Sequence, residues 1–260
     1  MCRLGAYSKG GGLCLPVRYV VPARVKESAV ADRGGLSKEA LVRAALVHVP
    51  FDGWSEATFQ AACTDLGVDV AQARVMVPRG ALDLALAYHA MGDAAMVARM
   101  AGEDMSAMRF RDRIAAMVRW RLEAADREAV RRGTVLFALP QHAGEGAKAI
   151  WGTADLIWRS LGDTSEDVNW YTKRATLAAV YGSVVLIWLG DQSVGSDETW
   201  AFLDRRIEDV MRIEKLKAQV RESPVLSKVF AAPLWALGKV RAPGSVEGLP
   251  GRVKPSGEAL

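Results

Sequence analysis

The residue types that most often carry out chemistry are sparse and scattered in this sequence. His48, His89 and His142 lie far apart, and none has a carboxylate three or four residues before it, so neither an HExxH nor an ExxH metal motif is present. The stretch GEGAKA at 144–149 lacks the spacing and the GK[ST] ending of a phosphate-binding loop, and no GxSxG nucleophile elbow occurs. The sequence therefore predicts no metal site, no cofactor and no enzyme.

Acidic pairs and cysteines fit structural roles better than catalytic ones. The pairs at 166–167 and 197–198 lie where helices are expected to begin, and a carboxylate there complements the helix dipole. Cys2, Cys14 and Cys63 form no CxxC pair, which favours reduced thiols in a reducing compartment. The net charge of +4 is too small, by itself, to indicate a nucleic-acid partner.

Large apolar side chains, by contrast, are concentrated in the second half of the chain. Six of the eight tryptophans are Trp151, Trp158, Trp170, Trp188, Trp200 and Trp235. A place in the core is the simplest interpretation of each residue alone. Their crowding into the helices expected after Gly144 also suits the wall of an apolar cavity between helices.

The elements that must position these side chains are all helices. Apolar residues recur at helical spacing after Leu36, with capping residues such as Ser37, Asp69 and Thr164 at expected starts, the last of these paired with Asp167 as a capping box. The helices are expected at 37–49, 55–67, 69–77, 78–91, 105–125, 127–139, 145–162, 167–190 and 196–220. In the helix at 105–125, Phe110, Ile114, Met117 and Leu122 are expected to point inward, opposite an arginine-rich outer face.

The first three helices have the pattern of a helix-turn-helix. The third, DVAQARVMV, offers only Gln72 and Arg74 for contacts with bases or phosphates. We therefore expect a helix-turn-helix kept as scaffold, without nucleic-acid binding. A repressor whose ligand is a small apolar molecule is the alternative.

Two apolar segments raise the question of a membrane. The uncharged run between Arg174 and Asp191 has 16 residues. That length is short for a span of about 20 residues, so a buried helix is expected. The segment 225–240 combines Trp, Phe and Leu with lysines, which is typical of a helix lying in a membrane interface, although a last helix packed on its own domain is equally compatible.

The two ends of the chain differ from the middle. Residues 1–35 are rich in Gly and Pro and have no acidic residue before Glu27, which predicts a disordered arm and a poor transit peptide. The expected organisation is an arm at 1–35, helix-turn-helix-like helices at 36–90, a ligand-binding bundle at 91–220, an amphipathic helix at 224–241 and a disordered tail at 242–260.

A family resemblance is carried by LGDTSEDVNWYTKRATLAAVYGSVVLIWLGDQS followed by DETWAFLDRRIEDVM. This region resembles the Coq nine family of ubiquinone-biosynthesis accessory proteins, most closely over 161–211 and more weakly back to about residue 36. The resemblance implies an all-α, TetR-like fold with a vestigial helix-turn-helix, and a lipid-binding protein without catalysis. Its pocket would hold a polyisoprenoid quinone precursor or another isoprene or phospholipid. It also implies a membrane-attaching C-terminal helix and a partner, the di-iron demethoxyubiquinone hydroxylase, to which an isoprenoid quinone intermediate is presented.

We hypothesise that the uncharged run and the helices facing it wall the lipid cavity, and that small residues at 178, 179, 182 and 183 keep it open. The expected lipid-binding residues are Ile114, Met117, Trp151, Trp158, Leu177, Val180, Tyr181, Val184, Leu186, Ile187 and Trp188. The positions that match the family's partner surface are Asp191, Ser193, Asp197, Thr199, Trp200 and Arg205. The expected membrane-binding residues are Leu226, Lys228, Val229, Phe230, Leu234, Trp235, Leu237 and Lys239.

The assembly and the location of the protein are predicted as well. We expect a homodimer. In a bacterial host, which the poor transit peptide favours, we expect a cytoplasmic protein attached peripherally to the inner membrane. In a eukaryotic host the equivalent place is the matrix side of the mitochondrial inner membrane.

Overall fold

A computed structural model describes residues 36–222, with side-chain surroundings described as far as residue 212. The helices in this range are α1 (Lys38–Asp52), α2 (Glu56–Asp65), α3 (Val70–Met76), α4 (Ala81–Gly102), α5 (Phe110–Glu123), α6 (Arg127–Ala138), α7 (Ala143–Ser160), α8 (Val168–Gly190) and α9 (Asp197–Glu222). A short 3-10 helix, η1 (Val194–Ser196), precedes α9, and residues 36–222 contain no strand. The all-α prediction is confirmed.

Capping side chains begin several of these helices where the sequence predicts. Ser37 accepts a hydrogen bond from the Ala40 amide, and Asp69 accepts from the amides of Ala71 and Gln72. One expected cap is wrong: the N-cap of α8 is Asp167, whose carboxylate accepts from the Asn169 amide, and not Thr164. An aspartate directly before the first turn is the better acceptor for its free amides.

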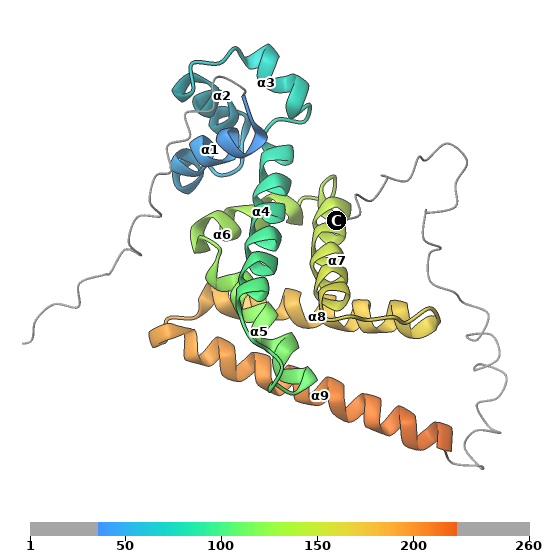
Figure 1. Cartoon of the computed structure of the whole chain (residues 1–260). Helices are drawn as coiled ribbons and strands as arrows, with labels where there is room; N and C mark the ends of the chain where they lie inside the picture. The colour runs from blue at the N-terminus through green and yellow to red at the C-terminus, as the bar shows by residue number, and fades with distance from the viewer. Residues whose placement is uncertain (1–35, 223–260) are drawn as a thin grey trace, which may run out of the picture. The chain divides into compact units, whose positions relative to one another are not determined.

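The helices pack into two apolar clusters that share α4. Figure 1 shows α4 running from α1, α2 and α3 to the helices of the second cluster. The first cluster joins α1 to α3 with the start of α4, and it includes Leu41, Phe59 and Leu84. The second joins the end of α4 with α5, α7, α8 and α9, and it includes Met96 and Ile157. The expected domain boundary at residue 90 falls inside α4, so one continuous helix contributes to both clusters.

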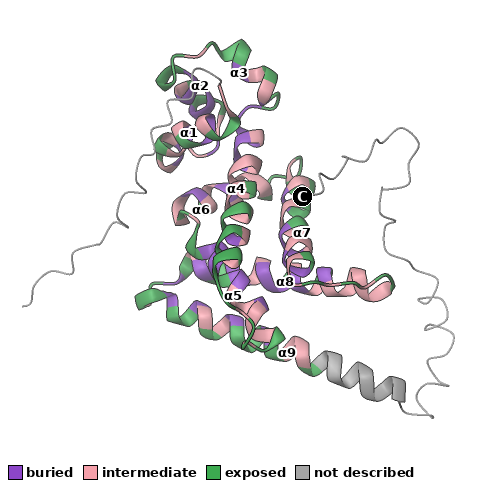
Figure 2. Cartoon of the chain, viewed as in Figure 1, coloured by how far each residue is buried: buried purple, intermediate pink, exposed green. Residues whose placement is uncertain are grey.

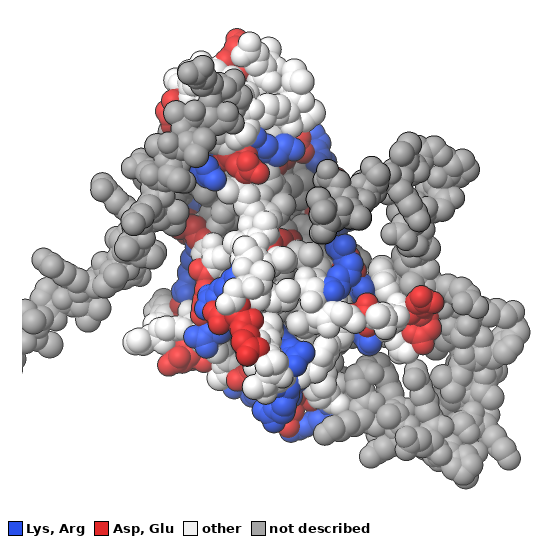
Figure 3. Space-filling view, in the orientation of Figure 1, with Lys and Arg blue, Asp and Glu red and all other residues white. Residues whose placement is uncertain are grey.

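The uncharged run forms most of α8, which is buried along much of its length (Figure 2). Its inward side chains include Leu177, Tyr181, Val184 and Trp188. Within residues 36–222, no helix is both long and apolar enough to cross a membrane. On the face drawn in Figure 3, basic and acidic side chains are interspersed, so the small net positive charge forms no single-sign field on that face.

Candidate functional site

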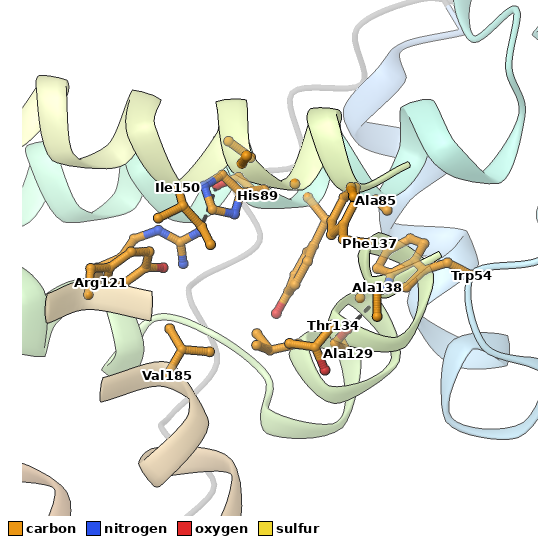
Figure 4. A pocket seen from close by; sticks show the side chains of 18 residues that line it. Trp54, Ala85, His89, Arg121, Ala129, Thr134, Phe137, Ala138, Ile150 and Val185 are labelled. Carbon is orange, nitrogen blue, oxygen red and sulfur yellow. Dashed lines mark hydrogen bonds between the residues drawn. The ribbon is translucent and has the colours of Figure 1, made fainter. Parts of the chain in front are cut away.

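An apolar cavity of about 390 Å³ lies among α4, α6, α7 and α8, and we call it the α6–α7 cavity (Figure 4). Its lining residues are Trp54, Ala85, Tyr88, His89, Arg121, Ala129, Val130, Gly133, Thr134, Phe137, Ala138, Ala143, Gly146, Ala147, Ala149, Ile150, Tyr181 and Val185. Eight of these residues are Ala or Gly. Small side chains on three packed helices leave space that larger ones would fill, which is why this region is hollow.

Gly146 sets how closely α6 and α7 approach beside this cavity. A Cβ atom at Gly146 would lie 2.7 Å from Cβ of Phe137 and 3.1 Å from its Cγ. The position of Cβ is fixed by the backbone of α6, so rotation of the Phe137 side chain could not relieve the 2.7 Å contact. Glycine is therefore needed here for the observed packing of the two helices.

A buried polar group forms one end of the cavity (Figure 4). Arg121 is only 3% exposed; its Nε donates to Asp93 at 2.6 Å and its Nη2 donates to the carbonyl oxygen of His89 at 2.9 Å. Thr153 donates its one hydroxyl proton to Asp93 at 2.9 Å and therefore accepts from Nε2 of His89 at 2.8 Å. The group is a charge-balanced pair supported by two hydrogen-bonding neighbours.

Burial shifts the pKa values of the titratable groups around the Arg121–Asp93 pair. Desolvation and the nearby positive charge of Arg121 lower the pKa of His89, so its imidazole is neutral at neutral pH. Burial raises the pKa of Tyr181 and of Tyr88, so both phenols keep their protons. The cavity thus presents one balanced cation and neutral polar groups in an otherwise apolar wall.

A second cavity of about 440 Å³, the α8–α9 cavity, lies among α5, α7, α8 and α9. Its lining residues are Phe110, Ile114, Trp158, Leu161, Gly162, Asp163, Thr164, Ser165, Lys173, Thr176, Leu177, Val180, Ile207, Val210 and Met211. Nζ of Lys173 donates to Asp163 at 2.8 Å and to Ser165 at 2.7 Å, so its rim is more polar than that of the first cavity.

The predicted lipid-binding residues are divided between these two cavities and the solid core. Tyr181 lines the α6–α7 cavity, whereas Ile114, Trp158, Leu177 and Val180 line the α8–α9 cavity.

The other predicted wall residues line neither cavity. Met117, Val184 and Trp188 are core residues, and Trp151 packs against Trp170 with ring centroids 6.1 Å apart. Leu186 and Ile187 are 67% and 40% exposed, so their placement on a cavity wall is wrong. The small residues at 178, 179, 182 and 183 line neither cavity, and Ala179 is exposed, so the expectation that they keep the cavity open is also wrong.

Helical spacing explains both the errors and the omissions. On α8 the buried residues recur at helical spacing as 177, 180, 181, 184, 185 and 188, and Leu186 falls on the opposite side of the helix. Ile187 lies at the edge of the buried face, so it is only partly covered. The sequence predicts an arginine-rich outer face for this helix, yet Arg121 continues the inward stripe of Ile114, Met117 and Val118 and is buried. That spacing was the signal that could have identified Arg121. Phe110, expected inward, is 42% exposed at the edge of the α8–α9 cavity.

Two of the predicted partner-binding residues are buried and organise the turn before α9. The carboxylate of Asp191 accepts hydrogen bonds from Ser193 and from the amide and hydroxyl of Thr199. These bonds hold the pKa of Asp191 far below its usual range. Arg127 donates to the carbonyl oxygen of Asp191 and to Ser196, so α6 is tied to the same turn.

The remaining predicted partner residues lie on or near the surface. Asp197 and Arg205 are exposed and Ser193 is half-buried. Trp200 is half-buried: its Nε1 donates to the carbonyl oxygen of Gly195 at 2.7 Å, and the Arg119 guanidinium lies 4.8 Å from its ring centroid. Val194, which the sequence did not single out, is 91% exposed at the tip of the turn.

Three further predictions concern other parts of the chain. On α3, Arg74 is paired with Glu56 and lies over the ring of Phe59, so its charge is neutralised within the protein. Among residues 36–222, no group of three or more potential metal ligands occurs. The predicted membrane-binding residues, from 226 to 239, lie outside the described residues.

Residues 143–214 match the COQ9 family model, which covers α7, α8, η1 and most of α9. The protein "Ubiquinone biosynthesis protein COQ9, mitochondrial" of Rattus norvegicus is 36% identical over 92 residues, which is 35% of this chain and 30% of that protein. "Ubiquinone biosynthesis protein COQ9-A, mitochondrial" of Xenopus laevis is 28% identical over 216 residues, which is 79% of this chain and 67% of that protein. The resemblance to this family is therefore confirmed, although the match spans less than a third of the rat protein.

A solved structure resembles this fold over about two thirds of the chain. The crystal structure of a TetR transcriptional regulator from Nitrosomonas europaea superimposes with a TM-score of 0.55 at 17% identity, covering 66% of this chain and 95% of that one. At this identity the likeness concerns the fold alone, and it confirms the prediction of a TetR-like helical bundle.

Proposed function

Because residues 143–214 carry a COQ9 domain, we propose that this protein is a lipid-binding accessory protein of ubiquinone biosynthesis. It binds an isoprenoid quinone intermediate at the membrane and presents it to the di-iron demethoxyubiquinone hydroxylase. It contributes no catalysis and needs no cofactor, because its part in the reaction is to bring a nearly insoluble substrate to another enzyme.

The observation that supports this proposal is the α6–α7 cavity. Its volume of about 390 Å³ is within the range of roughly 300–1,000 Å³ that small-molecule sites occupy. Its wall is mainly apolar, and α7 and α8 within the COQ9 domain supply seven of its residues. Moving an isoprenoid tail from water into such a space is favourable by roughly 0.8 kcal/mol for each buried CH₂ group.

The turn and the start of α9 support the proposed contact with the hydroxylase. Asp191 and Thr199 hold this turn from inside through their hydrogen bonds, while Val194 and Trp200 present apolar surface. The Arg119 guanidinium lies 4.8 Å from the Trp200 ring centroid, and Arg205 is exposed farther along α9. A rigid apolar anchor flanked by charge is favourable for a binding hot spot. We therefore keep the predicted partner surface, and we propose that its exposed residues contact the hydroxylase while its buried residues hold the turn in place.

Location and assembly follow from the same proposal. The membrane is contacted peripherally through the C-terminal segment, as in a protein that takes its ligand from a bilayer. The relatives named above carry "mitochondrial" in their names. In a bacterial host the corresponding membrane is the inner membrane, and a homodimer is the proposed assembly.

The alternative, a DNA-binding regulator, is less well supported by the described residues. Arg74, the one basic residue of α3, is already paired with Glu56. A recognition helix depends on free cations for its affinity, and this one offers none. A salt-dependent change in the gel mobility of DNA on addition of the purified protein would support the alternative.

The test is native mass spectrometry with lipid extraction on the full chain, together with binding of the purified hydroxylase. The proposal predicts a co-purified isoprenoid quinone and a complex with the hydroxylase. A protein that carries no lipid, and takes up none from vesicles containing ubiquinone, would contradict the lipid-binding part. A protein that carries lipid but does not bind the hydroxylase would contradict the presentation part alone.

A further inference from the structure

The α6–α7 cavity contains a cation whose hydrogen-bonding capacity is not fully used. Arg121 is almost completely buried, and its Nε and Nη2 donate to Asp93 and to the backbone of His89. Its Nη1 makes no hydrogen bond with any residue in the described part of the chain. A buried guanidinium normally has partners for its N–H groups, so one facing a cavity indicates a place for an acceptor atom.

We propose that Arg121 binds an uncharged oxygen atom on the head group of the ligand, and so selects a quinone-type or phenol-type ring over a charged lipid. This inference rests on the proposed function, because it assumes that the lipid occupies this cavity. The acceptor is uncharged because Asp93, 2.6 Å from Arg121, already balances the cation. An anionic head group would add an unbalanced charge to a poorly solvated space, which is costly.

The dimensions of the cavity favour a ligand that enters with its ring first. A volume of about 390 Å³ is near the lower limit for sites that hold drug-sized molecules. It suits a substituted ring and the first part of a tail, and a long isoprenoid chain must extend beyond it. In Figure 4, Arg121 and His89 lie at one end of the lining and Trp54 and Phe137 at the other. The ring is thus placed at the Arg121 end, and the tail leaves along the apolar residues.

Gly92 of α4 is what gives the Arg121 guanidinium its position. A Cβ atom at Gly92 would lie 2.4 Å from Nη1 and 2.5 Å from Cζ of Arg121. The guanidinium would have to move, while the charge and the helix would both remain. Gly92→Ala therefore tests the position of the cation without removing it. Gly152→Ala on α7 is a matched control, because its added Cβ would meet no atom within 4 Å.

The experiment compares two probes by isothermal titration calorimetry. One is a fully alkylated benzoquinone with a hexyl tail, whose ring cannot add to thiols. The other is the alkylbenzene of the same carbon skeleton, without the ring oxygens. We expect Gly92→Ala to weaken binding of the quinone about tenfold, the loss typical of one hydrogen bond to a charged group, and to leave binding of the alkylbenzene within about twofold. Gly152→Ala should leave both affinities unchanged.

A second variant removes the cation and keeps the charge balance. Arg121→Met combined with Asp93→Asn should show the same selective loss, with Asp93→Asn alone as its control and the thermal unfolding midpoint as a check on folding. If both variants weaken the two probes equally, or weaken neither, Arg121 does not bind the head group and lipid binding itself stands. If the wild-type protein binds neither probe, both this inference and the proposed lipid site are wrong.

Discussion

The guanidinium of Arg174 on α8 lies 2.9 Å from the carboxylate of Asp163, and the two side chains are 1% and 3% exposed. Arg174 also pairs with Asp155 of α7 at 2.6 Å, and its Cζ lies 4.1 Å from the ring centroid of Trp170. One buried cation thus joins α7, the loop that follows it and α8. This network fixes the rim of the α8–α9 cavity and the first turns of α8, the helix that lines both cavities.

We expect Arg174→Met to destabilise the protein by about 3–5 kcal/mol, because the substitution leaves Asp163 and Asp155 without their shared cation in a buried site. The measurement is chemical unfolding at neutral pH. The matched control is Arg159→Met, since Arg159 also pairs with Asp155 but is largely exposed, and such a pair contributes at most about 1 kcal/mol. Equal effects of the two substitutions would show that burial of Arg174 adds nothing.

The pKa of Asp163 predicts how the free energy of unfolding depends on pH. Burial alone would raise the pKa of Asp163, but hydrogen bonds from Lys173, Ser165 and Arg174 outweigh it and lower the pKa to about 2. Since the pKa is lower in the folded state than the ordinary 3.8, the stabilisation is complete above pH 3.8 and is lost as the pH falls toward 2. The free energy of unfolding should therefore fall over this interval more steeply in the wild type than in Asp163→Asn. Parallel curves would contradict this prediction.

Gly146→Ala should destabilise the protein by about 1–3 kcal/mol, because the new methyl group would clash with Phe137 and force α6 away from α7. Gly152→Ala on the same helix is the control, and it should be neutral or stabilise by up to about 1 kcal/mol because alanine favours helix. Thermal unfolding measures both. A neutral Gly146→Ala would mean that α6 can shift at no cost.

The turn before α9 predicts which residues contact the hydroxylase. Val194→Glu changes a side chain that is almost fully exposed, so it should leave the fold intact and weaken the complex with the hydroxylase about tenfold or more. Trp200→Lys should act in the same direction. Glu208→Ala, an exposed change farther along α9, is the control. If surface plasmon resonance shows an unchanged affinity for Val194→Glu and Trp200→Lys, this surface is not the interface.

Much of this structure could be predicted from residue patterns, for identifiable reasons. Helical period and capping residues such as Ser37 and Asp69 act within a few residues of sequence, so these helices and the starts of α1 and α3 were predicted well. The start of α5 was not, because that helix begins at Phe110 and not at the expected position 105. The burial of α8 followed from its uncharged run. The C-terminal membrane segment stays a prediction.

The cavities could not be predicted in the same way. The spacing of apolar residues along the sequence identifies the inward face of a helix. It does not identify the places where facing helices leave space, because these depend on contacts between helices, such as that between Gly146 and Phe137. Tyr181 and Leu177 are both inward residues of α8, yet they line different cavities. The buried arginines show the same limit, since Arg121 and Arg174 follow the inward stripe of their helices although charge predicts exposure.

The most direct measurement is lipid extraction and native mass spectrometry on a pair of variants that place the same bulk inside and outside the α6–α7 cavity. Ala149→Phe adds a ring to the cavity wall, whereas Ala179→Phe adds the same ring to the exposed side of α8. The account predicts that the wild type and Ala179→Phe co-purify with an isoprenoid quinone and that Ala149→Phe does not. The thermal unfolding midpoint of Ala149→Phe checks that this variant is folded. Equal lipid content in the two variants, or a wild-type protein free of lipid, would contradict it.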